Sequence, residues 1–404
     1  MKVIFVTDLD LWSMGNRKGG EAFFRTVTKY QEAGDEVFLI SDVEPNKNIT
    51  WLDNTHNILV KPSVFKRWVL TRKIGLFFRF ADHKIAGRKI IKELRKVINL
   101  VGKDKMILYA YEIFGVEACK RTSQKYGIPF VSRFQGTILT DIPYNVINIL
   151  RRYPHYQALR TKSDLVIMTD DGTKGDKVLE TVGNNSNYLF LKNGLELREE
   201  AVFEKVEQID RNTTRTEIGV DKDEIMFLTV SRLTGWKRVD RAIEGFAAFV
   251  KLGGIGKLVI VGDGDQRVAL QSLADEMGIG NRVVFVGAVK HEEVYKYMVA
   301  ADVFLSLFDL SNVGNPLLEA MTIGKCIVTL NVGDTGSVVN NDNGILMSKD
   351  NICSLGNIMF DLGKKDDVRK KFGDNARSYA VEHFYTWEKR LSIEYQEVSK
   401  LLAD

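Results

Sequence analysis

The segment "SRLTGWKRVDR" carries two cations at a spacing that suits an anionic ligand. Arg232 follows an apolar run typical of a strand, and Lys237 stands five residues later, where a helical pattern begins. A guanidinium grips two oxygens in a fixed fork and an ammonium adds a mobile point charge, so the pair suits a diphosphate. The alternative is that both side chains are solvated surface charges.

A second turn of this kind lies in "LFDLSNVGNPLLEAM", where a polar loop joins an apolar run to a helical pattern. Pro316 fits the first helical position and Asn315 the cap before it, so the amides of the first turn would be open to an anion. Glu319, one turn into the helix, can accept two sugar hydroxyls. The alternative for Glu319 is an exposed helical glutamate.

Two glycine-rich turns are further candidates for a phosphate. Gly19 and Gly20 in "NRKGGEAF" either let the backbone approach an anion or merely shape a turn. Gly262 and Gly264 in "VGDGDQR" lack the third glycine of a dinucleotide fingerprint and lie deep in the second half of the chain. We interpret this second pair as the turn after a central strand.

A protein-bound metal has little support. Asp8 and Asp10 form one acidic pair after the first strand, a pattern common by chance, and the five histidines include no ligand pair on one helix face. No Ser-His-Asp or Cys-His pairing follows from the spacing. Cys119, Cys326 and Cys353 are few and far apart, so we expect buried thiols in a reducing compartment rather than a disulfide or zinc framework.

Strands alternate with helices along the chain, which favours parallel α/β sheets. In the first half, Phe23, Val27 and Tyr30 predict a helix that ends at Gly34, among the strands "KVIFVTD", "EVFLIS", "MILYAY", "PFVSRF" and "DLVIMTD". The alternation restarts in "IMFLTVS", "KLVIVG", "RVVFVG", "DVFLSLF" and "CIVTL". Since 404 residues exceed the roughly 250–300 that one core serves, we expect domains 1–200 and 201–380, joined by the polar "EKVEQIDRNTTRTE".

Charge is distributed unevenly. Residues 1–200 hold 32 Lys and Arg against 23 Asp and Glu, and residues 65–105 alone hold 13 basic and 3 acidic residues interleaved with aromatic ones. This tract predicts either a face for an anionic membrane surface or a solvated helical surface. No nucleic-acid reading motif accompanies it, so nucleic acid is not expected as a partner.

The location of the protein follows from what the sequence lacks. No stretch approaches the ~18 unbroken apolar residues of a membrane span, and "MKVIFVTDLD" reaches Asp8 too soon for a signal peptide. We therefore expect a cytoplasmic protein, peripheral on the inner face of the cell membrane where residues 65–105 bind lipid.

Taken together, these motifs resemble the retaining glycosyltransferases of family 4, whose GT-B fold has two Rossmann-like domains facing a cleft for a nucleotide sugar. The order and spacing of the motifs carry the resemblance across nearly the whole chain. They are "GGEAFFRTVTKYQEAGDEV", "NGLE", "VSRLTGWKRVDRAIEGF", "KLVIVGDG", "NRVVFVGAVKHEEVYKYMVAADVFLSLF", "NPLLEAMTIGKCIV" and "TWEKRLSIEYQEV". The last, within residues 381–404, resembles the helix that crosses back to the first domain.

The resemblance implies roles for matching positions. Arg232 and Lys237 would hold the diphosphate, Glu319 the ribose, and the backbone near Val289 would face the base, while Gln135 would act with them in catalysis. No cofactor or metal is expected, because the two cations and the helix dipole would stabilise the leaving nucleoside diphosphate. The implied donor-binding residues are Gly19, Gly20, Arg232, Lys237, Val289, Ser311, Asn312, Gly314, Asn315, Leu317, Leu318 and Glu319.

Two positions depart from the family's pattern. Ser311 stands where the family usually has a glutamate that contacts the donor sugar, and Gln135 stands where it usually has a histidine. Both can still hydrogen-bond but bring no charge, so each contact should be about half as strong. An altered donor pocket or a weakened enzyme are both open, and Asp309 is a candidate to lend a carboxylate.

Three functions are consistent with this pattern. The first is a retaining transferase that moves a sugar from a nucleotide donor onto a glycan or lipid-linked acceptor, in cell-surface polysaccharide or glycoconjugate synthesis. The second is an inactive glycosyltransferase-like subunit that binds a nucleotide sugar or a partner. The third is an enzyme that makes a small-molecule glycoside and has no lipid affinity.

Overall fold

The computed structural model describes residues 1–9, 21–43, 55–60 and 76–403. The chain divides into two compact units, of which the first comprises residues 1–170, 174–192 and 388–404 and the second residues 171–173 and 193–387. The expected boundaries at 200 and 380 differ from this division in three places. The second unit starts earlier, it includes the short segment 171–173, and the return to the first unit falls later.

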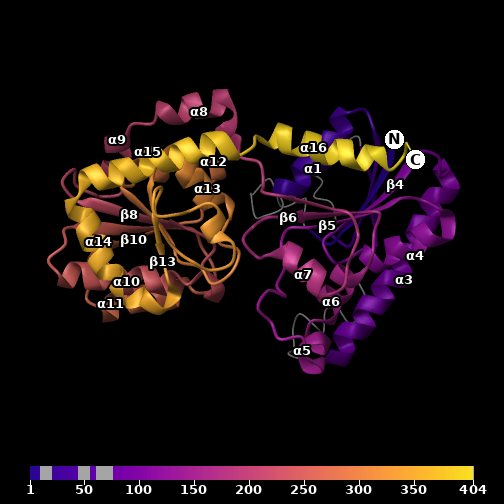
Figure 1. Ribbon diagram of the computed structural model, residues 1–404, viewed down its shortest axis with the longest axis horizontal. Helices are drawn as coiled ribbons and strands as arrows, with labels where there is room; N and C mark the ends of the chain where they lie inside the picture. The colour runs from indigo at the N-terminus through magenta and orange to yellow at the C-terminus, as the bar shows by residue number, and fades with distance from the viewer. Residues whose placement is uncertain (10–20, 44–54, 61–75, 404) are drawn as a thin grey trace. The chain divides into compact units, whose positions relative to one another are not determined.

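The first unit is built on a parallel seven-stranded sheet, of which β4, β5 and β6 are labelled in Figure 1. The order of its strands is β3-β2-β1-β4-β5-β6-β7. Its strands are β1 Lys2–Thr7, β2 Glu36–Ser41, β3 Thr55–Leu59, β4 Met106–Tyr111, β5 Phe130–Phe134, β6 Leu165–Thr169 and β7 Tyr188–Leu191. Its helices are α1 Glu21–Glu32, α3 Leu76–Val101, α4 Val116–Tyr126, α5 Val146–Arg151, α6 Tyr153–Arg160, α7 Gly175–Thr181 and α16 Trp387–Lys400.

Alternate residues of each central strand face opposite sides, so the first unit has two apolar layers. On one side Val3 and Phe5 of β1 pack with Phe23, Val27 and Tyr30 of α1, which confirms the predicted helix face. The C-terminal helix α16 covers the same side, where the rings of Tyr30 and Tyr395 pack at a tilt of 58° with 5.1 Å between their centroids. Helices α3, α4, α6 and α7 cover the other side.

The second unit has a parallel six-stranded sheet in the order β10-β9-β8-β11-β12-β13. Its strands are β8 Ile225–Val230, β9 Gly256–Val261, β10 Val283–Gly287, β11 Val303–Ser306, β12 Cys326–Leu330 and β13 Ile345–Met347. Its helices are α8 Glu200–Glu207, α9 Arg211–Glu217, α10 Val239–Lys251, α11 Arg267–Glu276, α12 His291–Ala300, α13 Asn315–Ile323, α14 Leu355–Lys364 and α15 Asp366–His383. Short 3-10 turns lie at Glu196–Arg198, Gly235–Lys237, Gly280–Arg282, Thr335–Ser337 and Lys349–Ser354.

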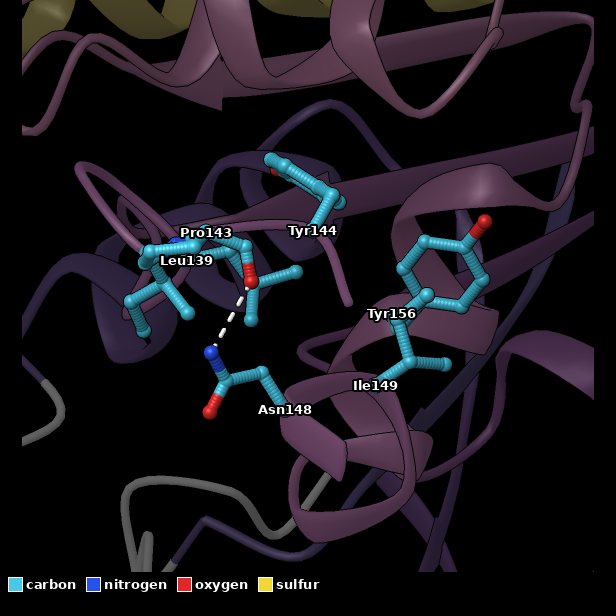
Figure 2. Close-up of a pocket in the computed structure, with 7 residues that line it drawn as sticks. Leu139, Pro143, Tyr144, Asn148, Ile149 and Tyr156 are labelled. Atoms are coloured by element: carbon cyan, nitrogen blue, oxygen red, sulfur yellow. Dashed lines mark hydrogen bonds between the residues drawn. The ribbon is translucent and has the colours of Figure 1, made fainter. Parts of the chain in front are cut away.

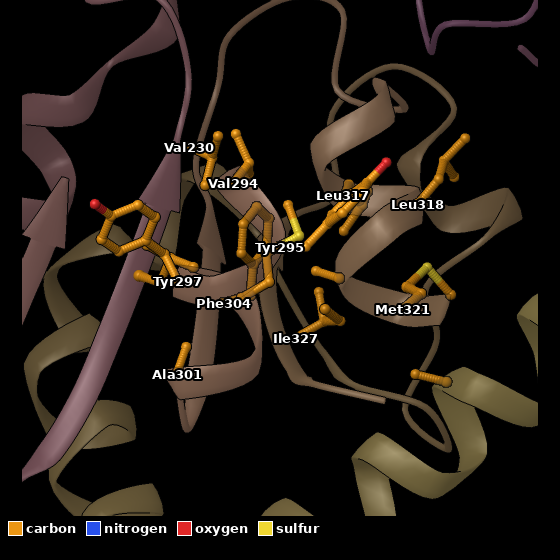
Figure 3. Packing of buried hydrophobic residues seen from close by; sticks show 14 of the residues in the cluster. Val230, Val294, Tyr295, Tyr297, Ala301, Phe304, Leu317, Leu318, Met321 and Ile327 are labelled. Carbon is orange, nitrogen blue, oxygen red and sulfur yellow. The ribbon is translucent and has the colours of Figure 1, made fainter. Parts of the chain in front are cut away.

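The core on one side of this sheet fixes the helices that reach the candidate site (Figure 3). Tyr295 of α12 and Leu317 of α13 pack there with Val230 of β8, Phe304 of β11 and Ile327 of β12. Helices α10, α11 and α14 cover the opposite side. Because both layers are closely packed, the loops at the carboxyl ends of β8 and β11 start from rigid positions.

The polar segment 204–217 is not a connection between domains, and that prediction was wrong. It contributes to α8 and forms α9, both within the second unit. Asp210 caps α9 by accepting from the amides of Asn212 and Thr213. Arg215 is buried against Asp302, at 3.2 Å between Nη1 and Oδ2. The helix is thus held by ion pairs, which an apolar pattern cannot reveal.

Three further expectations concern metals, thiols and membranes. Cys119 and Cys326 are buried as expected, but Cys353 is exposed, because it lies on the surface turn Lys349–Ser354. Within the described ranges no three His, Cys, Asp or Glu residues gather as metal ligands would. In the same part of the chain, none of the helices has the length and apolar character that crossing a bilayer requires.

Candidate active site

The turn after β8 brings the two predicted cations around one indole ring. The guanidinium carbon of Arg232 lies 5.7 Å from the centroid of the Trp236 ring, and Lys237 Nζ lies 4.4 Å from it. Cation–π attraction of this kind holds flexible side chains in place. Arg232 is exposed, so its fork is open to a ligand. The spacing of five residues therefore does bring both charges to the carboxyl end of β8.

The glycines of "VGDG" support this turn from β9. Gly262 has φ of 130°, and a Cβ there would lie 1.8 Å from the carbonyl oxygen of Ser231. A Cβ at Gly264 would lie 2.3 Å from the Leu233 carbonyl oxygen. Only glycine allows this approach of the two backbones. The interpretation of the segment as a turn after a central strand is confirmed, since β9 pairs with both β8 and β10.

Lys237 links the β8 turn to the loop after β11. Its Nζ donates to the Ser311 carbonyl at 3.3 Å and lies 4.0 Å from the centroid of Phe308. Burial and the neighbouring charge of Arg232 lower the pKa of Lys237 to about 7, although Asp171 opposes the shift. A bound dianion beside Lys237 would raise this pKa again, because its negative charge favours the protonated form of the amine.

Asp171 is a site residue that the sequence reasoning missed. It lies in the short segment 171–173, far along the chain from Ser311 and Lys237, yet it belongs to the same unit. Burial raises the pKa of its carboxyl group, and hydrogen bonds from Thr173 and Ser311 with the charge of Lys237 partly offset this. The Val313 amide donates to the Asp171 carbonyl at 3.0 Å. A partly buried carboxylate thus stands beside Ser311, the position of a glutamate in the family pattern that the sequence resembles.

The loop before α13 differs from prediction at the cap. Gly314, not Asn315, is the N-cap residue, and Asn315 and Pro316 are the first two helical residues. The extended backbone of Gly314, with φ of −89° and ψ of 165°, lets its carbonyl accept from the Leu317 and Leu318 amides at 3.0 and 3.3 Å. Those two amides are therefore hydrogen-bonded within the helix and are not open to a phosphate. The expected phosphate-binding amides are thereby limited to those that precede them at the start of α13.

The asparagines of this region have structural partners. Asn312 is buried and donates through Nδ2 to the Val332 carbonyl at 3.2 Å. Asn193, from the "NGLE" motif, donates to Asn315 Oδ1 at 3.2 Å. Ser311 itself has φ of 55°, a left-handed conformation that bends the loop towards Lys237. These contacts fix the loop between β11 and α13 without a ligand.

Glu319 is buried, so the alternative of an exposed helical glutamate is wrong. It is 2% exposed and lies 2.7 Å from His291 Nε2 through Oε1. The other ring nitrogen of His291, Nδ1, lies 3.5 Å from Glu196 Oε2. His291 starts α12 and Glu196 ends the "NGLE" motif, and neither was predicted. The imidazole orients Glu319, which makes its carboxylate a fixed acceptor rather than a mobile surface charge.

Asp309 and Val289 were also predicted as candidates in the second unit. Asp309 pairs with Arg238, Arg241 and Lys349, and although burial opposes it, Lys349 and Arg241 lower its pKa to about 2. It is therefore held as an ion-pair anchor and does not serve as a spare carboxylate. Val289 lies between β10 and α12, half-buried against the core.

The remaining predicted residues belong to the first unit. Gln135 follows β5, where its amide donates to Glu112 Oε1 and its Nε2 donates to the Tyr111 hydroxyl, both at 2.8 Å. These bonds fix its side chain at the carboxyl end of the sheet. Gly19, Gly20 and Asp10 lie outside the described residues, so their roles stay predictions.

The geometry defines a class of protein. Two units, each built on a parallel sheet covered by helices, constitute the GT-B fold, as expected. A solved Anabaena structure, HepE in complex with UDP and glucose, matches with a TM-score of 0.70 and 17% identity, over 100% of this chain and 99% of that one. At this identity the likeness shows the fold alone.

Sequence comparison agrees with the resemblance found in the motifs. Residues 210–379, less than half of the chain, match the model of the family described as glycosyl transferases group 1. An uncharacterized glycosyltransferase of Methanocaldococcus jannaschii is 28% identical over 246 residues, 60% of each chain. The N-acetyl-alpha-D-glucosaminyl L-malate synthase of Bacillus anthracis is 27% identical over 176 residues, 43% of this chain and 45% of that one. The chain thus spans less than two thirds of these relatives.

Proposed function

We propose that the protein is a retaining glycosyltransferase of family 4 that moves a sugar from a nucleoside diphosphate donor to a glycan or lipid-linked acceptor. The observation that carries the proposal is the pairing of Arg232 and Lys237 around Trp236. The match of residues 210–379 to a glycosyltransferase family model and the named activities of the relatives support it. Cell-surface polysaccharide or glycoconjugate synthesis is the role that this activity would serve.

The chemistry follows from the charges of the site. When the bond from the anomeric carbon to the diphosphate oxygen breaks, its electron pair leaves with the diphosphate, and Arg232 and Lys237 stabilise the added charge. Glu319, oriented by His291, accepts hydroxyls of the ribose. The acceptor oxygen attacks on the face that the diphosphate leaves, and the acceptor proton passes to the departing diphosphate. The anomeric configuration is then retained, and the reaction as proposed uses no metal.

The proposal is tested by donor screening. Thermal shift across nucleoside diphosphates and their sugars should identify one base that stabilises the protein, because a bound ligand raises stability with the logarithm of its concentration over Kd. The selected donor sugar should then be hydrolysed or transferred. Binding without turnover for every donor would instead support the inactive subunit, the second candidate, which the absence of a glutamate at Ser311 favours.

Lys237 makes donor binding dependent on pH. Since its pKa is about 7 and the charged form binds diphosphate, affinity for the selected nucleoside diphosphate should fall about tenfold per pH unit above 7. The loss of affinity should level off at the pH above which most of the binding is to the protein with neutral Lys237. Calorimetry from pH 6 to 9 measures it, with Lys237→Gln as a control that should lose this slope. A wild-type affinity that is constant over this range would contradict the assignment.

We expect the side chains of Asp171 and Ser311 together to form the contact with the donor sugar. We expect Asp171→Ser to lower kcat/KM by about tenfold to a hundredfold, the usual worth of a charge-assisted hydrogen bond. Ser311→Glu alone should also lower it, because two carboxylates would then share one buried space. The double variant Asp171→Ser/Ser311→Glu should recover part of the activity or change the donor preference. Asp350→Ser, an exposed carboxylate of the same unit, is the matched control.

Attachment to membranes is a separate part of the proposal. Residues 76–101 of the basic tract 65–105 form α3, and residues 65–75 lie outside the described ranges. Lysines and arginines near an anionic surface each contribute about 1 kcal/mol. The protein would then be cytoplasmic and peripheral on the inner face of the cell membrane, and vesicle binding that falls with salt would support this.

A further inference from the structure

The helix α5 of the first unit exposes apolar side chains that the fold does not use. None of its residues is buried. Val146, Ile147 and Leu150 are 71%, 62% and 52% exposed, and their spacing of i, i+1 and i+4 puts them on one helix face. Single exposed apolar residues are ordinary, but three on one face mark a contact surface.

The preceding loop extends this surface and holds the helix. Ile138 and Tyr144 are also more than one third exposed. The inner residues Asn148 and Ile149 line a small pocket with Leu139, Ile142, Pro143, Tyr144 and Tyr156 (Figure 2). Asn145 caps α5 by accepting from the Asn148 amide at 2.9 Å, and Asn148 Nδ2 donates to the Pro143 carbonyl at 2.9 Å. The helix is therefore fixed on its inner side while its outer side stays apolar.

The charge around α5 identifies the occupant. Residues 142–163 contain Arg151, Arg152, Arg160 and Lys162 and no acidic residue. Burial lowers the pKa of His155 on α6, and the neighbouring charge of Arg152 adds to this shift. The preceding loop carries one exposed acid, Asp141, whereas the charged residues of α5 and α6 are all basic. An apolar face bordered mainly by arginines complements a surface with acyl chains beneath anionic headgroups.

We infer that α5 is a membrane-inserting element, whose face of Val146, Ile147 and Leu150 enters the acyl region of an anionic bilayer while Arg151 and Arg152 contact its headgroups. This inference goes beyond the proposed activity, because it concerns a surface of the first unit and stands whether or not the chain transfers sugar. The inference also differs from the membrane role proposed for the basic tract 65–105. That role is attachment to the membrane surface by charge, whereas α5 inserts into the bilayer.

Vesicle flotation of the full chain tests the inference. Wild type should float with phosphatidylglycerol-containing vesicles, and Val146→Ser/Ile147→Ser/Leu150→Ser should lower its partition coefficient at least about tenfold. Arg151→Gln/Arg152→Gln should lower it by a similar factor at low salt. The control Val268→Ser removes an equally exposed valine, 74% exposed on α11, and should change nothing. Equal flotation of the triple-serine variant and wild type would overturn the inference.

Insertion is measured separately from adsorption. Because Cys119 and Cys326 are buried and Cys353 is exposed, a Cys353→Ser/Ile147→Cys variant accepts an environment-sensitive dye at one position. Its emission should shift to the blue with anionic vesicles, and that of a dye at Val268→Cys should not. Flotation without a blue shift would show adsorption through other residues and overturn the inference. So would a dimer in light scattering that the triple-serine variant abolishes. Donor hydrolysis should be the same in wild type and the triple-serine variant. A failure of the proposed glycosyltransferase activity is therefore distinguished from a failure of membrane insertion.

Discussion

Replacing Lys237 with alanine is expected to lower kcat/KM for the nucleotide-sugar donor by about 10²–10³-fold, and Arg232→Ala by a similar factor. Each side chain is a preorganised cation at the point where charge develops on the leaving diphosphate, and removal of one such donor typically costs roughly 3–4 kcal/mol. Lys237 also donates to the Ser311 carbonyl, so its loss loosens the loop before α13. Steady-state kinetics with the selected donor measure the effect.

Comparing a nucleoside with its diphosphate tests which part of the donor the two cations bind. Affinity should fall for the nucleoside diphosphate but little for the nucleoside, because only the diphosphate touches the two cations. Lys251→Ala is a matched control, since this exposed lysine ends α10, the helix that follows the turn of Lys237. If nucleoside and nucleoside diphosphate lose affinity equally, the two cations do not bind the diphosphate.

Glu394→Ala is expected to destabilise the first unit by about 3–5 kcal/mol, the cost of breaking a buried ion pair. Glu394 of α16 is 1% exposed, lies 3.4 Å from Arg133 Nη1, and accepts hydrogen bonds from Arg390 and Tyr109. Although burial opposes its charge, Arg133 and Arg390 lower its pKa. Without it, two fully buried guanidinium groups face one another uncompensated.

Urea unfolding followed by circular dichroism measures this loss. The control is Glu397→Ala on the same helix, whose pair with Lys400 is largely exposed and should contribute less than about 1 kcal/mol. The contribution of Glu394 should be complete above the unfolded carboxyl pKa near 4.5 and decline as pH falls through its lower folded pKa. A loss no larger than that of Glu397→Ala would show that the buried charges are not essential.

The apolar runs predicted the central strands of both sheets because those strands are buried on both faces and most of their residues are apolar, although β5 also buries Ser132 and Arg133. Three edge strands, β3, β7 and β13, were missed, whereas the apolar run "RVVFVG" predicted the fourth, β10. The missed strands β3 and β13 lack a long apolar run. In β3, "THNIL" has exposed polar residues on its open side, and β13 is only "ILM". An edge strand is defined by the neighbour that pairs with it, and that neighbour is distant in sequence.

The candidate site was predictable where its residues share a turn. Arg232 and Lys237 are five residues apart, so local spacing was enough to bring them together. Asp171 and His291 were missed because each reaches its partner, Ser311 or Glu319, only through the folded chain. A buried aspartate and a histidine beside a glutamate carry no local pattern, so only the packing of α12 on α13 and the return of segment 171–173 bring them into the site.

The segment 388–404 completes the first unit, although residues 193–387 of the second unit precede it in the chain. Domains generally fold in the order in which the ribosome releases them. Here Arg133 is synthesised before the second unit, and its carboxylate partner Glu394 after it. The first unit therefore cannot complete its core until residue 394 has been synthesised, and residues 193–387 of the second unit have the earlier opportunity to fold. A gene cut at residue 192 would leave the first fragment with a buried arginine and no counter-ion.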